Sequence, residues 1–350
     1  MEVKYLLFCN SNATVLFTLL VISIIPYNLF NHWDRLYPIS KKTRMKKNIL
    51  SLFIFLFVIN NLLSQENNKF EEMRKNVVEK AKDSLIKISS HTYAIIAKGG
   101  AGNVLVYESK NGFIIVDDQW EDLAPTINNL LKSISNKPVL YVLNTHFHFD
   151  HTDGNKAFGK SGIKIIAHDN LRKRLLSEQL VAKPVDVIQK AYPFEALPYI
   201  TFSDSLTLHE AEEDIKIFHV NNAHTDTDSF IEFQKDNVYH TGDVFVRYGF
   251  PFIDNNNGGN ILGIIKAVNN LITRTNDSSK IIPGHGPISS RNDLITYRNN
   301  LQLIVNRIND GIAKNLTVEQ IEQENPVKDI KWWNGLFITS TVYKMIKTSK

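Results

Sequence analysis

Short apolar runs alternate with turn-forming and amphipathic stretches along most of this chain. In residues 92–117, three such runs are separated by Gly-rich and Asn-Gly turns, a pattern typical of antiparallel hairpins. A helical pattern over residues 123–133 precedes a strand at 139–144, and a second strand at 163–167 precedes a helix at 170–180. The first half of the globular part therefore predicts a sheet with accompanying helices.

The second half repeats this alternation. Strands are predicted at residues 205–208, 215–220, 229–233 and 238–241, and a helix follows at 261–272. Because each amphipathic element must bury one face, two such halves pack best as two sheets face to face with helices outside. We therefore predict an α/β fold, a four-layer αββα sandwich.

Residues 181–200 interrupt the alternation with three prolines. We predict a loop here, near the mouth of a functional site. Its aromatic side chains, Tyr192, Phe194 and Tyr199, either line an apolar substrate surface or pack into the core. Core packing is the favoured interpretation because large aromatic side chains are usually buried.

Candidate chemistry lies directly after the strand at 139–144, in the sequence Asn-Thr-His-Phe-His-Phe-Asp-His-Thr-Asp-Gly-Asn. Four metal-binding side chains lie within six residues: His146, His148, Asp150 and His151. Alternate residues of an extended segment share a face, so His146 and His148 can converge on one ion. Asp150 and His151 follow a turn and could serve a second ion. Imidazole with carboxylate suits zinc or iron better than calcium or magnesium.

This segment resembles the His-x-His-x-Asp-His motif of the metallo-β-lactamase superfamily. The other pieces of that family's pattern follow in order. His224 follows one predicted strand, Asp243 ends a later strand, and His285 stands in a Gly-His-Gly turn after another. The resemblance extends over about residues 99–287. It also implies the αββα sandwich, with metals at one edge between the sheets.

The resemblance implies two divalent metal ions, with zinc as the expected element. Three histidines would hold the first ion: His146, His148 and His224. The second ion would be held by Asp150, His151 and His285. Asp243 would bridge the ions, and Asp150 would also act as the catalytic residue that orients a bridging hydroxide. Two ions about 3.5–4 Å apart lower the pKa of a shared water and so supply a nucleophile at neutral pH. We expect Asp117 to hold the loop that carries His146 to His151 (the metal loop) by hydrogen bonds rather than to bind metal.

The residue at one ligand position indicates which group of the family this chain resembles. Where one large group of true lactamases has a cysteine, this chain has Asp243, which resembles the glyoxalase II, lactonase and RNase Z type of site. Those lactamases carry a lysine three residues later that grips the substrate carboxylate, and this chain has Val246 there. The adjacent Arg247 could substitute, but it is at least as well explained as a solvated surface arginine. RNase Z is disfavoured because no long basic arm with interleaved aromatics is present.

The formal net charge of +4 is concentrated at the N-terminal end. The first 65 residues carry seven basic and two acidic side chains, so the rest of the chain is almost neutral. A neutral globular part argues against nucleic acid as a partner and leaves a small-molecule substrate. The single cysteine, Cys9, leaves no disulfide to predict.

The N-terminal region contains two apolar runs, the second at residues 49–63, with a basic stretch at 41–47 between them. From Met45 the order of basic, apolar and polar residues is typical of a secretory signal peptide. We interpret residues 45–65 as that peptide, and residues 1–44 as a non-native upstream extension or a membrane segment. The expected location is periplasmic or secreted. If the N-terminal segments are retained, the protein is membrane-anchored and both chain ends still lie outside; if the peptide is cleaved, no stable membrane partner is expected.

The expected organisation continues with a lead-in at residues 66–90, helical or loose, and a catalytic domain at 91–350 with C-terminal helices from about residue 290. Three functions follow. The favoured one is an exported binuclear metal-dependent hydrolase that uses a metal-bound hydroxide on an ester, lactone, thioester or amide. The second is a β-lactamase that hydrolyses β-lactam antibiotics. The third is a non-hydrolytic di-iron redox or binding member of the fold, disfavoured because no ligand is missing and no flavin-binding domain is attached.

Overall fold

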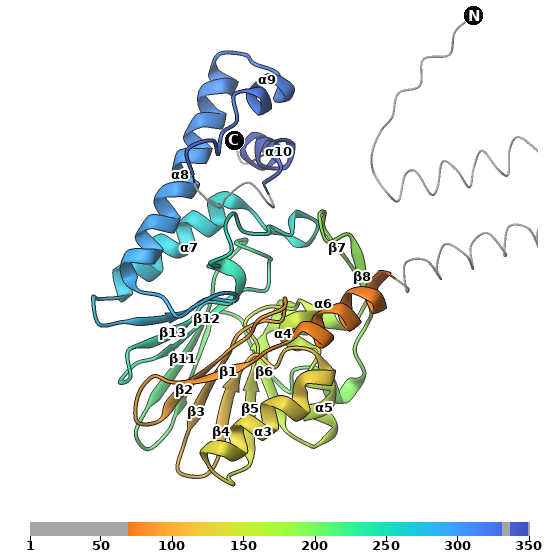
Figure 1. The fold of residues 1–350 in the computed structure, drawn as a ribbon, viewed down its shortest axis with the longest axis vertical. Coiled ribbons are helices and arrows are strands. Elements are labelled where there is room, and N and C mark those ends of the chain that lie inside the picture. The colour runs from red at the N-terminus through yellow and green to blue at the C-terminus, as the bar shows by residue number, and fades with distance from the viewer. Residues whose placement is uncertain (1–68, 331–336, 349–350) are drawn as a thin grey trace, which may run out of the picture. The chain divides into compact units, whose positions relative to one another are not determined.

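Two β-sheets form the centre of the described part of the chain, which comprises residues 69–330 and 337–348 of a computed structural model (Figure 1). The first sheet has the strand order β1-β2-β3-β4-β5-β6-β9. Its strands are β1 (Ser84–Lys87), β2 (Thr92–Ile96), β3 (Val104–Glu108), β4 (Phe113–Val116), β5 (Val139–Leu143), β6 (Lys164–His168) and β9 (Ile200–Phe202). Neighbours are antiparallel from β1 to β4 and parallel from β4 to β9.

The second sheet has the order β10-β11-β12-β13-β14, antiparallel except for the parallel pair β13 and β14. Its strands are β10 (Ser205–His209), β11 (Asp214–His219), β12 (Ser229–Phe233), β13 (Val238–His240) and β14 (Lys280–Ile282). A separate hairpin joins β7 (Gln179–Val181) to β8 (Val187–Gln189). The predicted strands therefore formed, within one or two residues of the expected ends.

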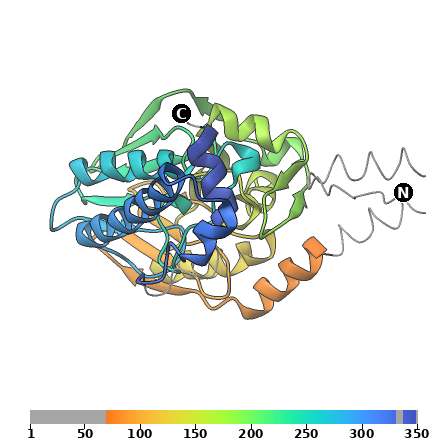
Figure 2. The ribbon, with the colours of Figure 1, turned by 90° about the horizontal axis from the view of Figure 1, so that it is seen from above.

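Three apolar clusters define the layers. Between the sheets, side chains such as Leu105 and Ile114 from the first meet Ile217 and Ile231 from the second. On the outer face of the first sheet lie α3 (Ala124–Ile134) and α5 (Asn155–Lys160). On the outer face of the second lie α7 (Ile261–Arg274) and α8 (Arg291–Ala313), side by side (Figures 1 and 2). The predicted αββα sandwich is confirmed, and strands covered on both faces explain the near-continuous apolar runs.

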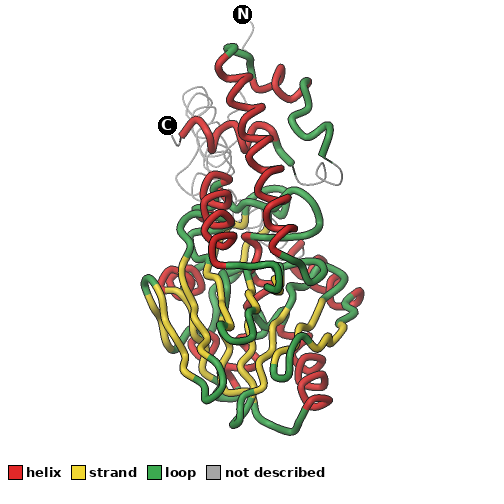
Figure 3. Tube along the Cα trace, turned by 90° about the vertical axis from the view of Figure 1, so that its left-hand side faces the viewer, coloured by secondary structure: helices red, strands yellow, loops and turns green. Residues whose placement is uncertain are grey.

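The C-terminal part is helical, as predicted. After α8 come α9 (Val318–Gln323) and α10 (Thr339–Thr348), and these helices extend beyond the sheets (Figure 3). A reciprocal capping box between Ser290 and Asp293 opens α8. The same end of α8 reaches the functional region described below, because Asp293 also forms an ion pair with Arg247.

Two local predictions were wrong in part. The lead-in, predicted as helical or loose, is helical at residues 69–80, but residues 84–87 form β1 because they find an antiparallel partner in β2. The helix predicted at 170–180 ends early, as α6 (Asp169–Leu175), and the chain continues into the β7–β8 hairpin. In both places pairing with another strand outweighs the local helical pattern.

The aromatic residues of segment 181–200 divide between surface and core. Tyr192 is buried, but Phe194 and Tyr199 are 79% and 69% exposed, so the preference for core packing was wrong for these two. Each ring instead has one cation over its face: Arg172 Cζ lies 6.0 Å from the centroid of Phe194, and Lys164 Nζ lies 4.2 Å from that of Tyr199.

The predicted upstream extension (residues 1–44) and signal peptide (45–65) lie outside the described residues. Among the residues that are described, no helix has both the length and the apolar character needed to cross a bilayer.

Candidate metal centre

The four segments that carry the predicted ligands meet at one edge of the two sheets. The first follows β5 and includes the short helix α4 (Phe149–Thr152), and the second follows β11. The third follows β13 as the 3₁₀ turn η3 (Gly242–Val244), and the fourth follows β14. Together they bring seven side chains into one cluster: His146, His148, Asp150, His151, His224, Asp243 and His285.

The first group is a buried triangle of histidines. His148 Nδ1 and His224 Nε2 are 2.9 Å apart, and the His146 ring lies 4.9 Å and 4.7 Å from theirs, centroid to centroid. His146 Nε2 is buried and has no hydrogen-bond partner among the described residues. Three nitrogens that face one another in this way match the set predicted for the first ion.

The second group is partly open to solvent. His285 Nε2 lies 3.1 Å from Asp150 Oδ2 and 3.4 Å from His151 Nε2. The side chains of Asp150 and His285 are 15% and 17% exposed, whereas His151 is fully buried. This set matches the one predicted for the second ion, and its open side defines the mouth of the site.

Asp243 lies between the two groups. Its carboxylate oxygens are 3.3 Å from His151 Nε2, 3.5 Å from His285 Nε2 and 3.9 Å from His224 Nε2. This is the position that the predicted bridging role requires.

His148, His151 and His224 are each held from behind by a second hydrogen bond. Asp117 contacts His151 Nδ1 at 2.8 Å and also accepts from the Thr145 backbone and hydroxyl, so it braces the metal loop as predicted. The Phe252 carbonyl contacts His224 Nδ1 at 2.8 Å. Such contacts select the tautomer and leave the other nitrogen directed into the cluster.

A buried carboxylate that the sequence did not single out holds His148. Asp254 Oδ2 lies 2.9 Å from His148 Nε2, and its other oxygen accepts from the Ala182 amide. Asp254 is fully buried and also accepts from Asn257 Nδ2. The residue is 106 positions from His148 in the chain, so no local spacing connects them.

The electrostatic environments of the two groups differ. Burial, with the neighbouring His151 and His224, lowers the pKa of His146 well below its usual range. Burial and His148 lower the pKa of His224 to about 4. Burial also opposes charge on His285, but the Asp243 and Asp150 carboxylates outweigh it and raise that pKa to about 10. His146 and His224 are therefore neutral at pH 7, whereas the second group shares protons with carboxylates.

The close packing of this cluster depends on two glycines. A Cβ at Gly284 would lie 1.8 Å from Asp243 Oδ1, and a Cβ at Gly102 would lie 2.4 Å from His151 Cε1. Neither gap leaves room for any side chain, so the loops can approach these ligands only as glycine backbone.

The residues present fit a metal centre. Besides His146 Nε2, Asp243 Oδ1 is buried without a hydrogen-bond partner among the described residues, which is costly unless a cation completes the site. Nitrogen and carboxylate donors in overlapping groups of three are the ligand sets that divalent transition metals take.

The loop after η3 packs closely against the cluster. Phe250 and Phe252 in this loop are buried: Phe250 packs against Phe337, and Phe252 packs against the His148 and His224 rings. Arg247 is held by Asp293 at 2.5 Å and by Ser289 Oγ. Its guanidinium therefore braces the loop from outside.

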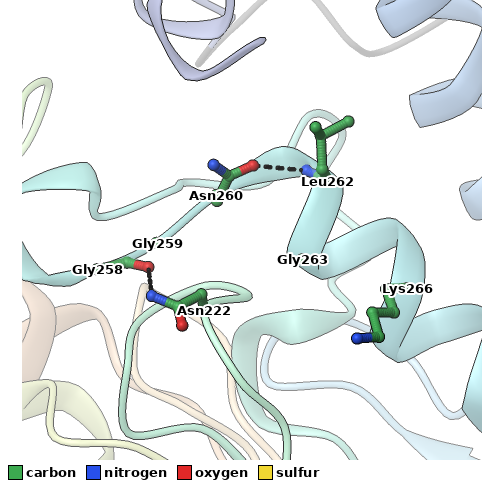
Figure 4. Close-up of a pocket in the computed structure, with 7 residues that line it drawn as sticks. All are labelled: Asn222, Gly258, Gly259, Asn260, Leu262, Gly263 and Lys266. Atoms are coloured by element: carbon green, nitrogen blue, oxygen red, sulfur yellow. Dashed lines mark hydrogen bonds between the residues drawn. The ribbon is translucent and has the colours of Figure 1, made fainter. Parts of the chain in front are cut away.

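A surface pocket of about 370 Å³ lies beside the start of α7. Figure 4 shows Asn260 Oδ1 capping the amide of Leu262 there, and Asn222 Nδ2 donating to the Gly258 carbonyl. Lys266 also lines this pocket, but none of the seven clustered residues does. The pocket is separate from the metal cluster.

Comparison with known proteins gives the family. The model of the metallo-beta-lactamase superfamily matches residues 97–285. A linear primary-alkylsulfatase of Pseudomonas sp. (strain ATCC 19151) is 32% identical over 94 residues, which span 25% of this chain and 18% of that protein.

Two solved structures match this chain to different extents. The sec-alkylsulfatase Pisa1 from Pseudomonas sp. has a TM-score of 0.59 at 16% identity, over 76% of this chain and 50% of that one. A metallo-beta-lactamase from Pontibacter korlensis has a TM-score of 0.49 at 18% identity, over 63% of this chain and 99% of that one. This chain thus spans half of Pisa1 and less than a fifth of the primary-alkylsulfatase.

Proposed function

The chain belongs to the metallo-beta-lactamase superfamily, and on that premise we propose that it is an exported binuclear metal-dependent hydrolase. Its proposed substrates contain an ester, lactone, thioester or amide bond. The observation that carries the proposal is the convergence of five imidazoles and two carboxylates on one partly open cluster. Sets of imidazole and carboxylate ligands with an open side are typical of catalytic metal sites.

Two divalent ions, zinc in our proposal, would supply the chemistry there by lowering the pKa of a shared water and by polarising the bond to be cleaved. The chain's own residues do the rest. Asp117 and Asp254 hold two of the ring nitrogens in place from behind. The carboxylate of Asp150 reaches the open side of the cluster, where it can orient the attacking water and take its proton.

Sulfate esters are a second candidate substrate class. The alkylsulfatase relatives favour them, because one is 32% identical over 94 residues and the other has a similar fold over most of this chain. Hydrolysis of a sulfate ester has the same two requirements, a positioned nucleophile and a positive charge that stabilises the ester oxygens. Because the aligned parts cover half or less of those proteins, this class stands second.

The β-lactamase alternative has weaker support. The role proposed for a basic residue after Asp243 is to bind the substrate carboxylate, and Arg247 is the only nearby candidate in the sequence. Its guanidinium is engaged by Asp293 and Ser289. Binding a substrate there would require that ion pair to break.

The test is a substrate panel on purified, zinc-loaded protein. The panel contains carboxylic esters, lactones, thioesters, alkyl sulfates and a chromogenic cephalosporin. We expect hydrolysis of at least one class, and a loss on the order of 100-fold or more in Asp243→Asn. Asp277→Asn, which changes an exposed carboxylate, is the matched control and keeps full activity. If the metal-loaded protein hydrolyses nothing in the panel, the proposal fails.

Metal analysis of protein purified without added metal separates the remaining alternative. Two zinc ions per chain support the hydrolase, whereas a pair of iron ions with no hydrolysis supports the di-iron redox alternative. Cell fractionation tests export: a chain recovered outside the cytoplasm with its N-terminus near residue 65 supports the signal peptide, and an uncleaved cytoplasmic chain contradicts it.

A further inference from the structure

Tyr248 lies at the mouth of the metal centre, in the loop that follows Asp243. Its ring centroid is 5.8 Å from that of His285, on the side of the cluster that is open to solvent. The side chain is 41% exposed, so the ring is partly accessible from solvent. A phenol next to an open ligand group is placed where a bound substrate must pass.

The loop that carries Tyr248 is tied to the metal ligands at both ends. The Arg247 amide donates to the His285 carbonyl, and the Phe252 carbonyl contacts His224 Nδ1. The Arg247–Asp293 ion pair fastens the same loop to α8. The position of the phenol is therefore coupled to the positions of the ligands, which is the rigidity that a functional side chain needs.

The hydrogen-bonding state of the phenol oxygen makes it a donor. Tyr248 Oη accepts the Phe252 amide at 3.2 Å, and its own hydrogen has no acceptor among the described residues. A tyrosine phenol has a pKa of about 10 in water, so it keeps its proton at neutral pH without any special environment. Because Oη only accepts a hydrogen bond within the loop, its hydrogen can be donated to a ligand without breaking the bond to the Phe252 amide.

We propose that Tyr248 is a catalytic residue that donates a hydrogen bond from Oη to an oxygen of the substrate as negative charge develops on that oxygen. This inference rests on the proposed hydrolase function. Tyr248 would then stabilise the oxyanion together with the metal ions that are expected at the site. The ligand chemistry is an oxygen that is anionic or becomes so, as in an ester, a sulfate ester or inorganic phosphate.

The experiment compares Tyr248→Phe with the parent protein, both zinc-loaded. The variant removes only the hydroxyl, and Tyr199→Phe, at an exposed ring stacked on Lys164, is the matched control. We expect kcat to fall about 10- to 100-fold with little change in KM, because the bond strengthens in the transition state. Metal content stays at the parent value, and inorganic phosphate binds at least about fivefold more weakly by calorimetry.

Two results overturn the inference. One is an unchanged kcat together with an unchanged phosphate affinity. The other is a fall in activity that follows a matching loss of zinc, because the hydroxyl then only secures the Phe252 amide. If the parent protein hydrolyses no substrate, the proposed function fails by itself, and the phosphate affinities of the parent and Tyr248→Phe still decide whether the phenol contacts a bound oxyanion.

Discussion

The two halves of the metal centre should respond differently to protons. His285 has a pKa raised to about 10 and His224 one lowered to about 4. An ion that binds the second group must displace a proton from His285, whereas His146 and His224 in the first group are already neutral. We therefore predict that, between about pH 6.5 and 8.5, the affinity for one ion rises with pH and the affinity for the other is nearly constant.

The size of the effect follows from the pKa of His285. At pH 7 that group is about 3 pH units below its midpoint, so proton competition weakens the second ion on the order of 1,000-fold relative to a neutral site. The apparent affinity should then rise about tenfold per pH unit for each proton displaced. The pKa of His151 is also raised, by Asp150, Asp243 and Asp117 acting against burial, so up to two protons are involved.

The assay is calorimetric titration of zinc into chelator-stripped protein, in buffers of different ionisation enthalpy. It gives the protons released per ion as well as the affinities. His224→Gln and His285→Gln form a matched pair that assigns the two events, since each removes a ligand from only one group. Proton release should survive the first substitution and fall by about one proton per chain in the second. Equal proton release by both ions, or a second affinity that does not change with pH, would refute the electrostatic argument.

Three further predictions use other contacts. Asp254→Asn removes the buried carboxylate behind the first group, and we expect zinc affinity there to fall about 10- to 100-fold, measured by competition with a chelator; unchanged affinity would contradict this. Gly102→Ala places a methyl group against His151 and should abolish the second ion and activity, whereas Gly162→Ala, where nothing lies within 4 Å of the new atom, should cost only about 1–2 kcal/mol from its positive φ and keep both ions. In metal-free protein the raised pKa of His285 stabilises the folded state fully below about pH 6.5, and this stabilisation is lost as pH rises through about 10. Thermal unfolding with a chelator present should therefore show Tm falling over that window. A Tm that does not change with pH would exclude the effect.

The alternation of apolar and polar residues determined most of the fold. Most strands of both sheets and the helices α3 and α7 formed close to their predicted ends, because amphipathic periodicity is a local property and packing on a sheet buries the apolar face. The predictions were wrong where pairing with a distant strand determined the secondary structure. Residues 84–87 became β1 because β2 was available to pair with them.

The metal centre divides in the same way. The sequence by itself indicated the identity and order of the seven candidate ligands and the place of Asp243 between them, because these residues match the pattern of the family it resembles. Only the tertiary structure put Asp254 behind His148, Gly102 against His151 and Tyr248 beside His285. These contacts join residues up to about a hundred positions apart. They depend on how the two sheets are packed, so the spacing of residues along one strand or helix cannot predict them.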